Sequence, residues 1–127
     1  MKINVNSEIG KLKSVLLHRP HKELLNLTPY LLDELLFDEI PFLDNAQKEH
    51  DMFANIFRQN GCEVFYLEDL CAESLYDDGL RTAFIEEFLD NADVYVENEK
   101  RLLREYLFSI KDNKELFLSK VAVRFVE

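Results

Sequence analysis

The sequence predicts an α/β fold, in which a unit of the ββαβ type is followed by a small helical bundle. Two short apolar runs, residues 14–18 and 62–67, have a helical pattern between them. From Glu68 onward the spacing of the apolar residues becomes helical throughout. The length of 127 residues and the 47% hydrophobic content are typical of an ordinary globular chain. Since strand, helix and strand follow in this order, we expect the two strands to be parallel.

Strands are predicted at three places in the first half. Residues 3–7 alternate apolar and polar side chains before Gly10, which indicates a first strand. Residues 13–18 form a second strand that ends before Pro20, and its continuous apolar character predicts cover on both faces. Residues 62–67 form the third strand.

Two helices are expected between the second and third strands. Thr28 can cap a helix of two or three turns that ends near Phe37, because Pro29 suits its first position. A second helix, with Asp44 or Asn45 as its cap, ends at Asn60 and Gly61. One face of this second helix carries Ala46, His50, Phe53, Ala54 and Phe57.

Four further helices are predicted over residues 68–120, with short turns between them. The turns lie at residues 77–79, 91–93 and 111–113, which are rich in Asp, Asn and Gly. This change of pattern divides the chain into a first unit at residues 1–70 and a helical bundle at residues 71–127. The apolar residues 121–126 end without a polar segment, so we expect the chain to be a fragment.

Charge and cysteine content exclude several classes of protein. With 25 acidic against 15 basic residues the formal net charge is −10, which disfavours binding to nucleic acid or to anionic membranes. The apolar runs are too short to span a bilayer and the first residues lack a signal-peptide core, so we expect a cytoplasmic protein. Cys62 and Cys71 are too few for a disulfide framework and are expected to be reduced.

The search for catalytic motifs is mostly negative. His50 beside Asp51 suggests a metal site, but Ala46 and Ala54, one turn away on the same face, offer no ligand. A structural histidine is therefore the favoured interpretation, and no metal is expected. For His18 a satisfied interior role is favoured over a catalytic one. For Cys62 and Cys71, a role as small core residues is favoured over a role as a nucleophile.

Residues 35–41 are the most distinctive segment, because two carboxylates lie there between apolar neighbours. Asp38 and Glu39 could recognise a cationic ligand from a loop that its apolar residues hold in place. Alternatively they solvate a turn, which composition alone favours. On composition, a small acidic protein that binds a cationic small molecule is one functional class to consider.

Six segments follow one another in the order found in bacterial arginine deiminases, and the sequence resembles the amino-terminal third of those enzymes. The resemblance runs from Ile3 to about Leu118, and the first seventy residues are its specific part. The segments are SEIGKLK at 7–13, VLLHRP at 15–20, NLTP at 26–29, LLFDEIP at 35–41, the helix around EHD at 49–51, and EVFYLE at 63–68.

The resemblance implies a pentein-type fold, an α/β propeller of five ββαβ units around a channel, with a helical domain inserted after the first unit. It also implies hydrolysis of L-arginine to L-citrulline and ammonia by a cysteine thiolate, through a covalent intermediate and without metal or organic cofactor. In the family the catalytic Cys, the His of a His-x-Asp motif, the Glu and the paired Asp residues come from later units. No catalytic residue is therefore expected in this chain.

The resemblance assigns substrate binding to Leu36, Phe37, Asp38 and Glu39. It implies that the backbone carbonyl of Leu36 receives the amino group of the substrate and that the loop carrying the other three closes over the site. Glu39 departs from the second Asp that is usual in the family, and Cys62 stands where a small apolar residue is usual.

Two functional hypotheses follow. The chain is the amino-terminal part of an arginine deiminase and is inactive alone, or it is a non-catalytic remnant that acts as an interaction module. In either case the strand edges and apolar faces of a single propeller unit favour self-association, so we expect a homo-oligomer.

Overall fold

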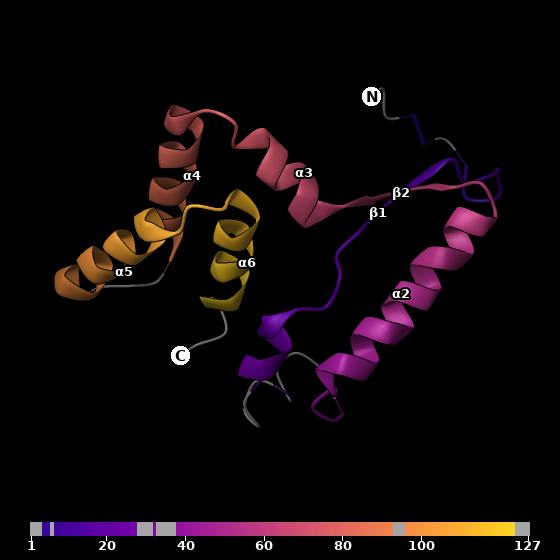
Figure 1. Cartoon of the computed structure of the whole chain (residues 1–127), viewed down its shortest axis with the longest axis horizontal. Coiled ribbons are helices and arrows are strands. Elements are labelled where there is room, and N and C mark those ends of the chain that lie inside the picture. Colours follow the sequence, from indigo (N-terminus) through magenta and orange to yellow (C-terminus); the bar gives the residue numbers. More distant parts are fainter. Residues whose placement is uncertain (1–3, 6, 28–31, 33–37, 93–95, 124–127) are drawn as a thin grey trace.

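The computed structural model of the chain describes residues 4–5, 7–27, 32, 38–92 and 96–123. Strands β1 (Ser14–Leu17) and β2 (Glu63–Tyr66) pair in parallel, with Ser14 opposite Glu63 and Leu17 opposite Tyr66. Helix α2 (Leu43–Gln59) connects them and lies on one side of this sheet, while the later helices lie on the other (Figure 1). The fold is therefore mixed α/β and mostly helical, and the predicted parallel crossover is confirmed.

The strand predicted at residues 3–7 is absent from the part of that segment that the structure describes. Asn4, Val5 and Ser7 belong to no strand, and the Val5 side chain is 85% exposed. An alternating pattern predicts a strand only where a neighbouring edge is available to pair with it, and the described sheet has two strands. The described residues thus show a strand–helix–strand unit rather than a complete ββαβ unit.

The segment between β1 and α2 is described in part. A 3-10 helix, η1 (Lys22–Asn26), leads to the buried Leu27. The cap Thr28, Pro29 and nearly all of the helix expected from there to Phe37 lie outside the described residues.

Helix α2 begins two or three residues earlier than the sequence predicted. Its first residue is Leu43 and its N-cap is Phe42, which makes no side-chain capping bond, so the prediction of Asp44 or Asn45 as the cap is wrong. Asp44 instead lies in the first turn, where its negative charge interacts favourably with the free N–H groups of the helix end. The predicted end is confirmed, because Asn60 is the C-cap and Gly61 follows at a φ of 73°.

In the described part of the chain four helices follow β2, as predicted. They are α3 (Leu67–Ser74), α4 (Asp78–Asn91), α5 (Glu97–Ser109) and α6 (Asn113–Val123). Asp77 caps α4, since its Oδ1 accepts the N–H groups of Gly79 and Leu80 at 2.8 and 3.2 Å. Asp112 similarly accepts the N–H of Glu115 at 2.7 Å. The Asp residues of the turns predicted at 77–79 and 111–113 thus cap the helices that follow, and α4 and α6 begin within those turns.

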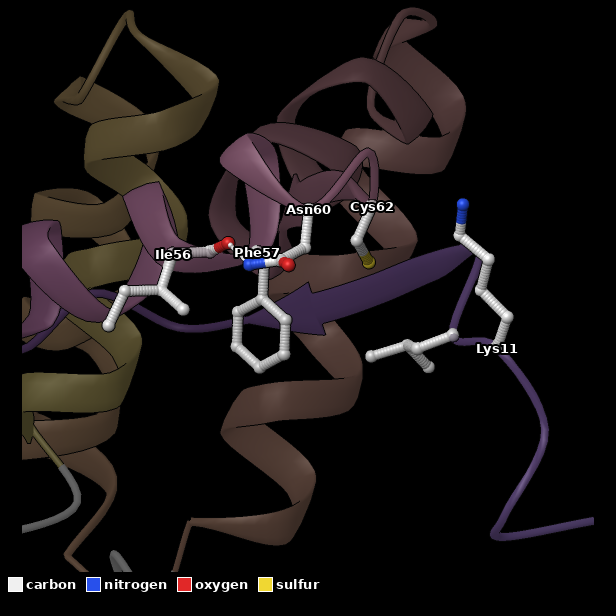
Figure 2. Close-up of a pocket in the computed structure, with 6 residues that line it drawn as sticks. Lys11, Ile56, Phe57, Asn60 and Cys62 are labelled. Atoms are coloured by element: carbon white, nitrogen blue, oxygen red, sulfur yellow. Dashed lines mark hydrogen bonds between the residues drawn. The ribbon is translucent and has the colours of Figure 1, made fainter.

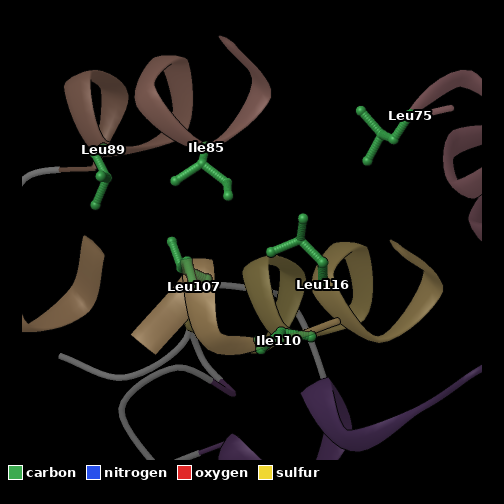
Figure 3. Close-up of a cluster of buried hydrophobic side chains, with 6 residues drawn as sticks. All are labelled: Leu75, Ile85, Leu89, Leu107, Ile110 and Leu116. Carbon is green, nitrogen blue, oxygen red and sulfur yellow. The ribbon is translucent and has the colours of Figure 1, made fainter. Parts of the chain in front are cut away.

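The described hydrophobic core lies among these helices. Its largest fully buried side chains are Ile85 and Leu89 of α4, Leu107 of α5 and Leu116 of α6, which face one another in Figure 3. Polar side chains also connect these helices. The Asn113 amide donates a hydrogen bond to the Leu75 carbonyl at 2.7 Å, and Arg81 donates one to the carbonyl of Ile110. Helix α6 packs against both α3 and η1, so it joins the bundle to the first half of the chain.

Candidate functional site

Polar side chains gather where β1 and β2 end. Because the strands are parallel, the residues that follow them, His18 and Arg19 after β1 and Glu68 near the start of α3, lie at the same edge of the sheet. Ligand sites of open α/β sheets usually lie at this edge. We call the group formed by His18, Arg19, Glu23, Asp51 and Glu68 the carboxyl-end cluster.

His18 is held between two carboxylates. Its Nδ1 lies 3.1 Å from Glu68 Oε2 and its Nε2 lies 3.3 Å from Glu23 Oε1. Glu68 is 4% exposed, whereas the His18 side chain is 31% exposed. The backbone N–H of His21 also donates to Glu23 Oε1, at 2.7 Å. His18 is therefore a satisfied histidine, as the sequence favoured, although it is only partly buried.

Arg19 forms a two-point contact with Asp51 of α2. Its Nε and one terminal nitrogen donate to the two carboxylate oxygens at 2.8 and 2.9 Å. This hydrogen bonding lowers the pKa of Asp51 and raises the pKa of Arg19. Gln47 adds a second link, because its amide donates to the Pro20 carbonyl at 2.9 Å. The segment after β1 is thus tied to α2 by polar contacts.

His50 has a different environment. Its ring centroid lies 5.9 Å from that of Tyr66 and 6.5 Å from that of Phe53, and its buried Nδ1 has no hydrogen-bond partner among the described residues. The described ranges contain no group of three His, Cys, Asp or Glu side chains arranged to hold a metal ion. At His18, the carboxylates of Glu68 and Glu23 contact opposite nitrogens of the ring, so their oxygens do not converge on one point as metal ligands would.

The two cysteines are separated from a catalytic environment. Cys62 is buried beside the amino end of β2, whereas His18 lies beyond the carboxyl end of β1. Five residue steps of about 3.3 Å along parallel strands place these residues on the order of 16 Å apart. Burial, together with the negative charge of Glu68, raises the pKa of the Cys71 thiol. Cys71 is therefore held as a thiol, and Cys62 lies far from His18.

The resemblance assigned substrate binding to four residues. Two of them, Leu36 and Phe37, lie outside the described residues. Asp38 and Glu39 are exposed in bends before Pro41. Neither carboxylate forms a hydrogen bond or ion pair with another described residue, and so the structure does not join them to the carboxyl-end cluster. The pairings within the cluster were not predicted from the sequence, although the rule for parallel strand ends could have brought His18 and Glu68 together.

A cavity of about 340 Å³ lies at the opposite end of the sheet (Figure 2). Its lining is mostly apolar and its one charged side chain is a lysine; the residues are Lys11, Leu12, Ile56, Phe57, Asn60 and Cys62. Without a carboxylate this cavity is unsuited to a guanidinium cation.

Comparison with known sequences identifies the family. The sequence profile of the arginine deiminase family matches residues 33–126, which include α2 and all four later helices. The chain belongs to the arginine deiminase family. The resemblance inferred from the sequence motifs is therefore confirmed, and it extends through the helical half.

Individual members of the family are similar over nearly the whole chain. The arginine deiminase of Treponema denticola is 60% identical over 117 residues, which cover 91% of this chain and 28% of that protein. The arginine deiminase of Streptococcus uberis is 57% identical over 114 residues, which cover 90% of this chain and 28% of that protein. This chain thus spans about 28% of the length of the relatives that it matches.

Proposed function

We propose that this chain forms the first part of an arginine deiminase, which hydrolyses L-arginine to L-citrulline and ammonia. The observation that carries the proposal is the 60% identity to an arginine deiminase over 91% of this chain. In this reaction a C–N bond of the guanidinium breaks, its nitrogen leaves as ammonia, and the oxygen of water becomes the carbonyl oxygen of citrulline. The chain's two-part division at residue 70 would separate the first propeller unit from the inserted helical bundle.

The contribution of this chain to the reaction would be to bind substrate. In this proposal the Leu36 carbonyl receives the amino group of arginine, and Phe37, Asp38 and Glu39 cover the site. Support comes from the exposure of Asp38 and Glu39, since exposed carboxylates can meet a cationic substrate. Glu39 reaches one methylene further than the Asp that is usual in the family, so it would position the loop differently.

The isolated chain is proposed to be inactive. Guanidinium hydrolysis needs a nucleophile, a general acid or base and carboxylates at one place, and losing one such group costs several powers of ten in rate. Cys62 and His18 lie at opposite ends of the sheet, and Cys71 is kept as a thiol. The candidates in this chain therefore do not form a reaction centre.

A chimera tests the proposal directly. The 117 matching residues of the Treponema denticola enzyme are replaced by this chain, and citrulline production from millimolar arginine is measured. We expect the chimera to keep its rate within about tenfold, and the Glu39→Asp variant of the chimera to lower KM. A folded chimera without activity would contradict the proposal.

The same assay on the isolated chain tests its inactivity. We expect no citrulline above the blank. Turnover that disappears in Cys62→Ser or Cys71→Ser would show that this chain carries a reaction centre of its own. Persistence of the turnover in both variants would instead identify a contaminating enzyme.

A second candidate function is that of a non-catalytic module that associates with a second copy of itself. The observation in its favour is the apolar surface of the first half, where Leu16 is 53% exposed and Ile56 is 58% exposed.

We also propose a cytoplasmic location. In the described part of the chain, no helix is long and apolar enough to cross a membrane.

A further inference from the structure

The carboxyl end of α2 contains a chemically labile pair of residues. Asn60 is the C-cap, and Gly61 follows at a φ of 73°, which residues with a Cβ rarely adopt. The glycine that this turn requires also creates the one Asn–Gly pair of the sequence. A backbone nitrogen attacks a preceding asparagine side chain most easily when it belongs to glycine, because glycine has no Cβ to obstruct the approach. The residue that ends the helix therefore also makes its C-cap reactive.

The reaction open to this pair is deamidation. The backbone nitrogen of Gly61 loses its proton to solvent and bonds to Cγ of Asn60, whose amide nitrogen takes up a proton and leaves as ammonia. Water then opens the cyclic succinimide at either of its carbonyl carbons. One product is aspartate, and the other is isoaspartate, in which the main chain runs through the former side chain. Water is the only co-reactant, and both residues are exposed to it.

In the folded chain both reacting groups are engaged by the last turn of α2. The N–H of Gly61 donates to the Arg58 carbonyl at 3.0 Å. The side-chain amide of Asn60 donates to the Ile56 carbonyl at 2.8 Å, one turn before the cap. The nitrogen that would attack and the amide that would leave are thus bonded to two different carbonyls. Both hydrogen bonds must break before Gly61 can reach Cγ of Asn60.

We propose that Asn60–Gly61 is a deamidation site gated by the C-cap of α2, and that it reacts while the last turn of the helix is open. The N–H of Cys62 donates to the Phe57 carbonyl at 3.0 Å, which with the bond of Gly61 completes a Schellman motif. Phe57 and Cys62 also line the apolar cavity (Figure 2). Since deamidation is slow compared with the opening of a helix end, its rate follows the open fraction. The inference does not depend on the proposed function.

The products loosen the turn that protected the pair. A carboxylate at residue 60 has no N–H to donate to the Ile56 carbonyl, and a negative charge is unfavourable at the carboxyl end of a helix. Isoaspartate also lengthens the main chain before Gly61, which moves the N–H of Gly61 away from its acceptor. The first link of β2 to β1 follows closely, because the N–H of Glu63 donates to the Lys13 carbonyl at 2.9 Å. Deamidation therefore frees the end of α2 and the start of β2.

The first test measures the reaction with and without the fold. The wild-type chain is incubated with and without urea at one pH and temperature, and peptide mapping by mass spectrometry follows each asparagine. We expect Asn60 to deamidate at least about tenfold faster in urea than in the folded chain. Asn55 and Asn98, which are exposed and precede larger residues, should stay intact in both. Equal rates at Asn60 would overturn the gating, and no reaction at Asn60 in urea would overturn the site itself.

The second test separates opening of the helix end from unfolding of the whole chain. Phe57→Ala removes an apolar side chain from the Schellman motif, and it should speed deamidation of the folded chain about three- to tenfold. Phe57→Leu is a milder variant that should fold and give a smaller acceleration. Leu107→Ala weakens the buried core of the helical bundle and should leave the rate within about twofold of the wild type. An acceleration in Leu107→Ala that equals or exceeds those of the Phe57 variants would refute a local gate.

The third test uses Asn60→Asp, which reproduces the aspartate product. We expect amide hydrogen exchange at Gly61 and Cys62 to quicken, and the unfolding constant to rise about two- to fivefold, because the charge lies at the carboxyl end of α2. Asn98→Asp is the matched control, since it makes the same change in the first turn of α5, where a negative charge is favourable. It should not raise the unfolding constant. Unchanged exchange in Asn60→Asp, or an equal rise of the unfolding constant in Asn98→Asp, would contradict the proposed effect of the modification.

Discussion

The helical half and the strand half of this chain are held together by different forces. In the helical half, Ile85, Leu107 and Leu116 are fully buried against one another (Figure 3). In the strand half, the buried side chains of α2 and β2's amino end are the small Ala54 and Cys62, while large apolar residues such as Ile56 remain 58% exposed. Among the residues that the structure describes, one half therefore completes a hydrophobic core, and the other does not.

Polar contacts take the place of a core in the strand half. Arg19 binds Asp51 through two hydrogen bonds, and His18 binds Glu23 and Glu68. Such contacts contribute less to stability than apolar burial, but they fix the positions of side chains in a defined geometry. Stability therefore resides mainly in the helical half, whereas in the strand half polar contacts set the positions of the side chains. The motifs that identified the family also lie mostly in the strand half.

The largest effect should come from a cavity in the core of the helical half. Leu107→Ala removes a side chain that is 0% exposed, and we expect the free energy of unfolding to fall by about 3 kcal/mol. Leu102→Ala on the same helix, where the side chain is 51% exposed, should change it by less than about 0.5 kcal/mol. Urea unfolding measures both. Equal losses would contradict the assignment of stability to the core.

The fold was predicted best where local chemistry decides it. Asp77 and Asp112 begin helices because their side chains accept backbone N–H groups, and Gly61 ends α2 with a positive φ. The parallel pairing of the strands followed from their connection through a helix. The prediction failed at Asn4 and Val5, because strand formation depends on a neighbouring edge that no local pattern specifies.

The site was less predictable than the fold. The sequence places His18 and Glu68 fifty residues apart, and only the register of β1 on β2 brings them to the same edge. The pairing of Arg19 with Asp51 likewise depends on where α2 lies beside the sheet. The family came from the order of motifs, not from geometry, so Leu36, Phe37, Asp38 and Glu39 stay a prediction as substrate residues.

Self-association would sharpen the comparison, because it should depend on the half whose apolar surface is open. We expect the chain to form dimers or larger assemblies at high concentration through the strand half. Ile56→Lys should weaken this association by tenfold or more, which corresponds to about 1.4 kcal/mol, because it puts a charge into the apolar surface.

Leu102→Lys is the matched control, since Leu102 is 51% exposed and Ile56 is 58% exposed. It lies on α5 in the helical half and should leave association unchanged. Sedimentation measures all three proteins. A wild type that stays at 15.0 kDa at every concentration would contradict the prediction.

A smaller change should stabilise the strand half. Nδ1 of His50 is buried without a partner among the described residues, and its ring packs near Tyr66 and Phe53. His50→Phe keeps an aromatic ring and removes the unpaired nitrogen, so we expect a gain of about 1 kcal/mol in the free energy of unfolding. His50→Asn, which keeps polar atoms and loses the ring, should lower stability. A loss in His50→Phe would indicate that the nitrogen is satisfied.

The smallest effect should separate the two halves by their response to acid. Hydrogen bonding from Arg19 lowers the pKa of Asp51 below its ordinary value of 3.8, and hydrogen bonding from Arg104 lowers that of Glu86 below 4.5. Each pair therefore stabilises the folded state above the ordinary value, and this contribution is lost as pH falls through the lowered one. Both pairs are partly exposed, so the losses should be small and local. Amide hydrogen exchange followed from pH 5 to pH 3 should show Asp51→Asn blunting the acid response of α2, and Glu86→Gln that of α4 and α5. If either variant altered both regions equally, the two halves would respond to acid as one unit, and their different construction would not govern local stability.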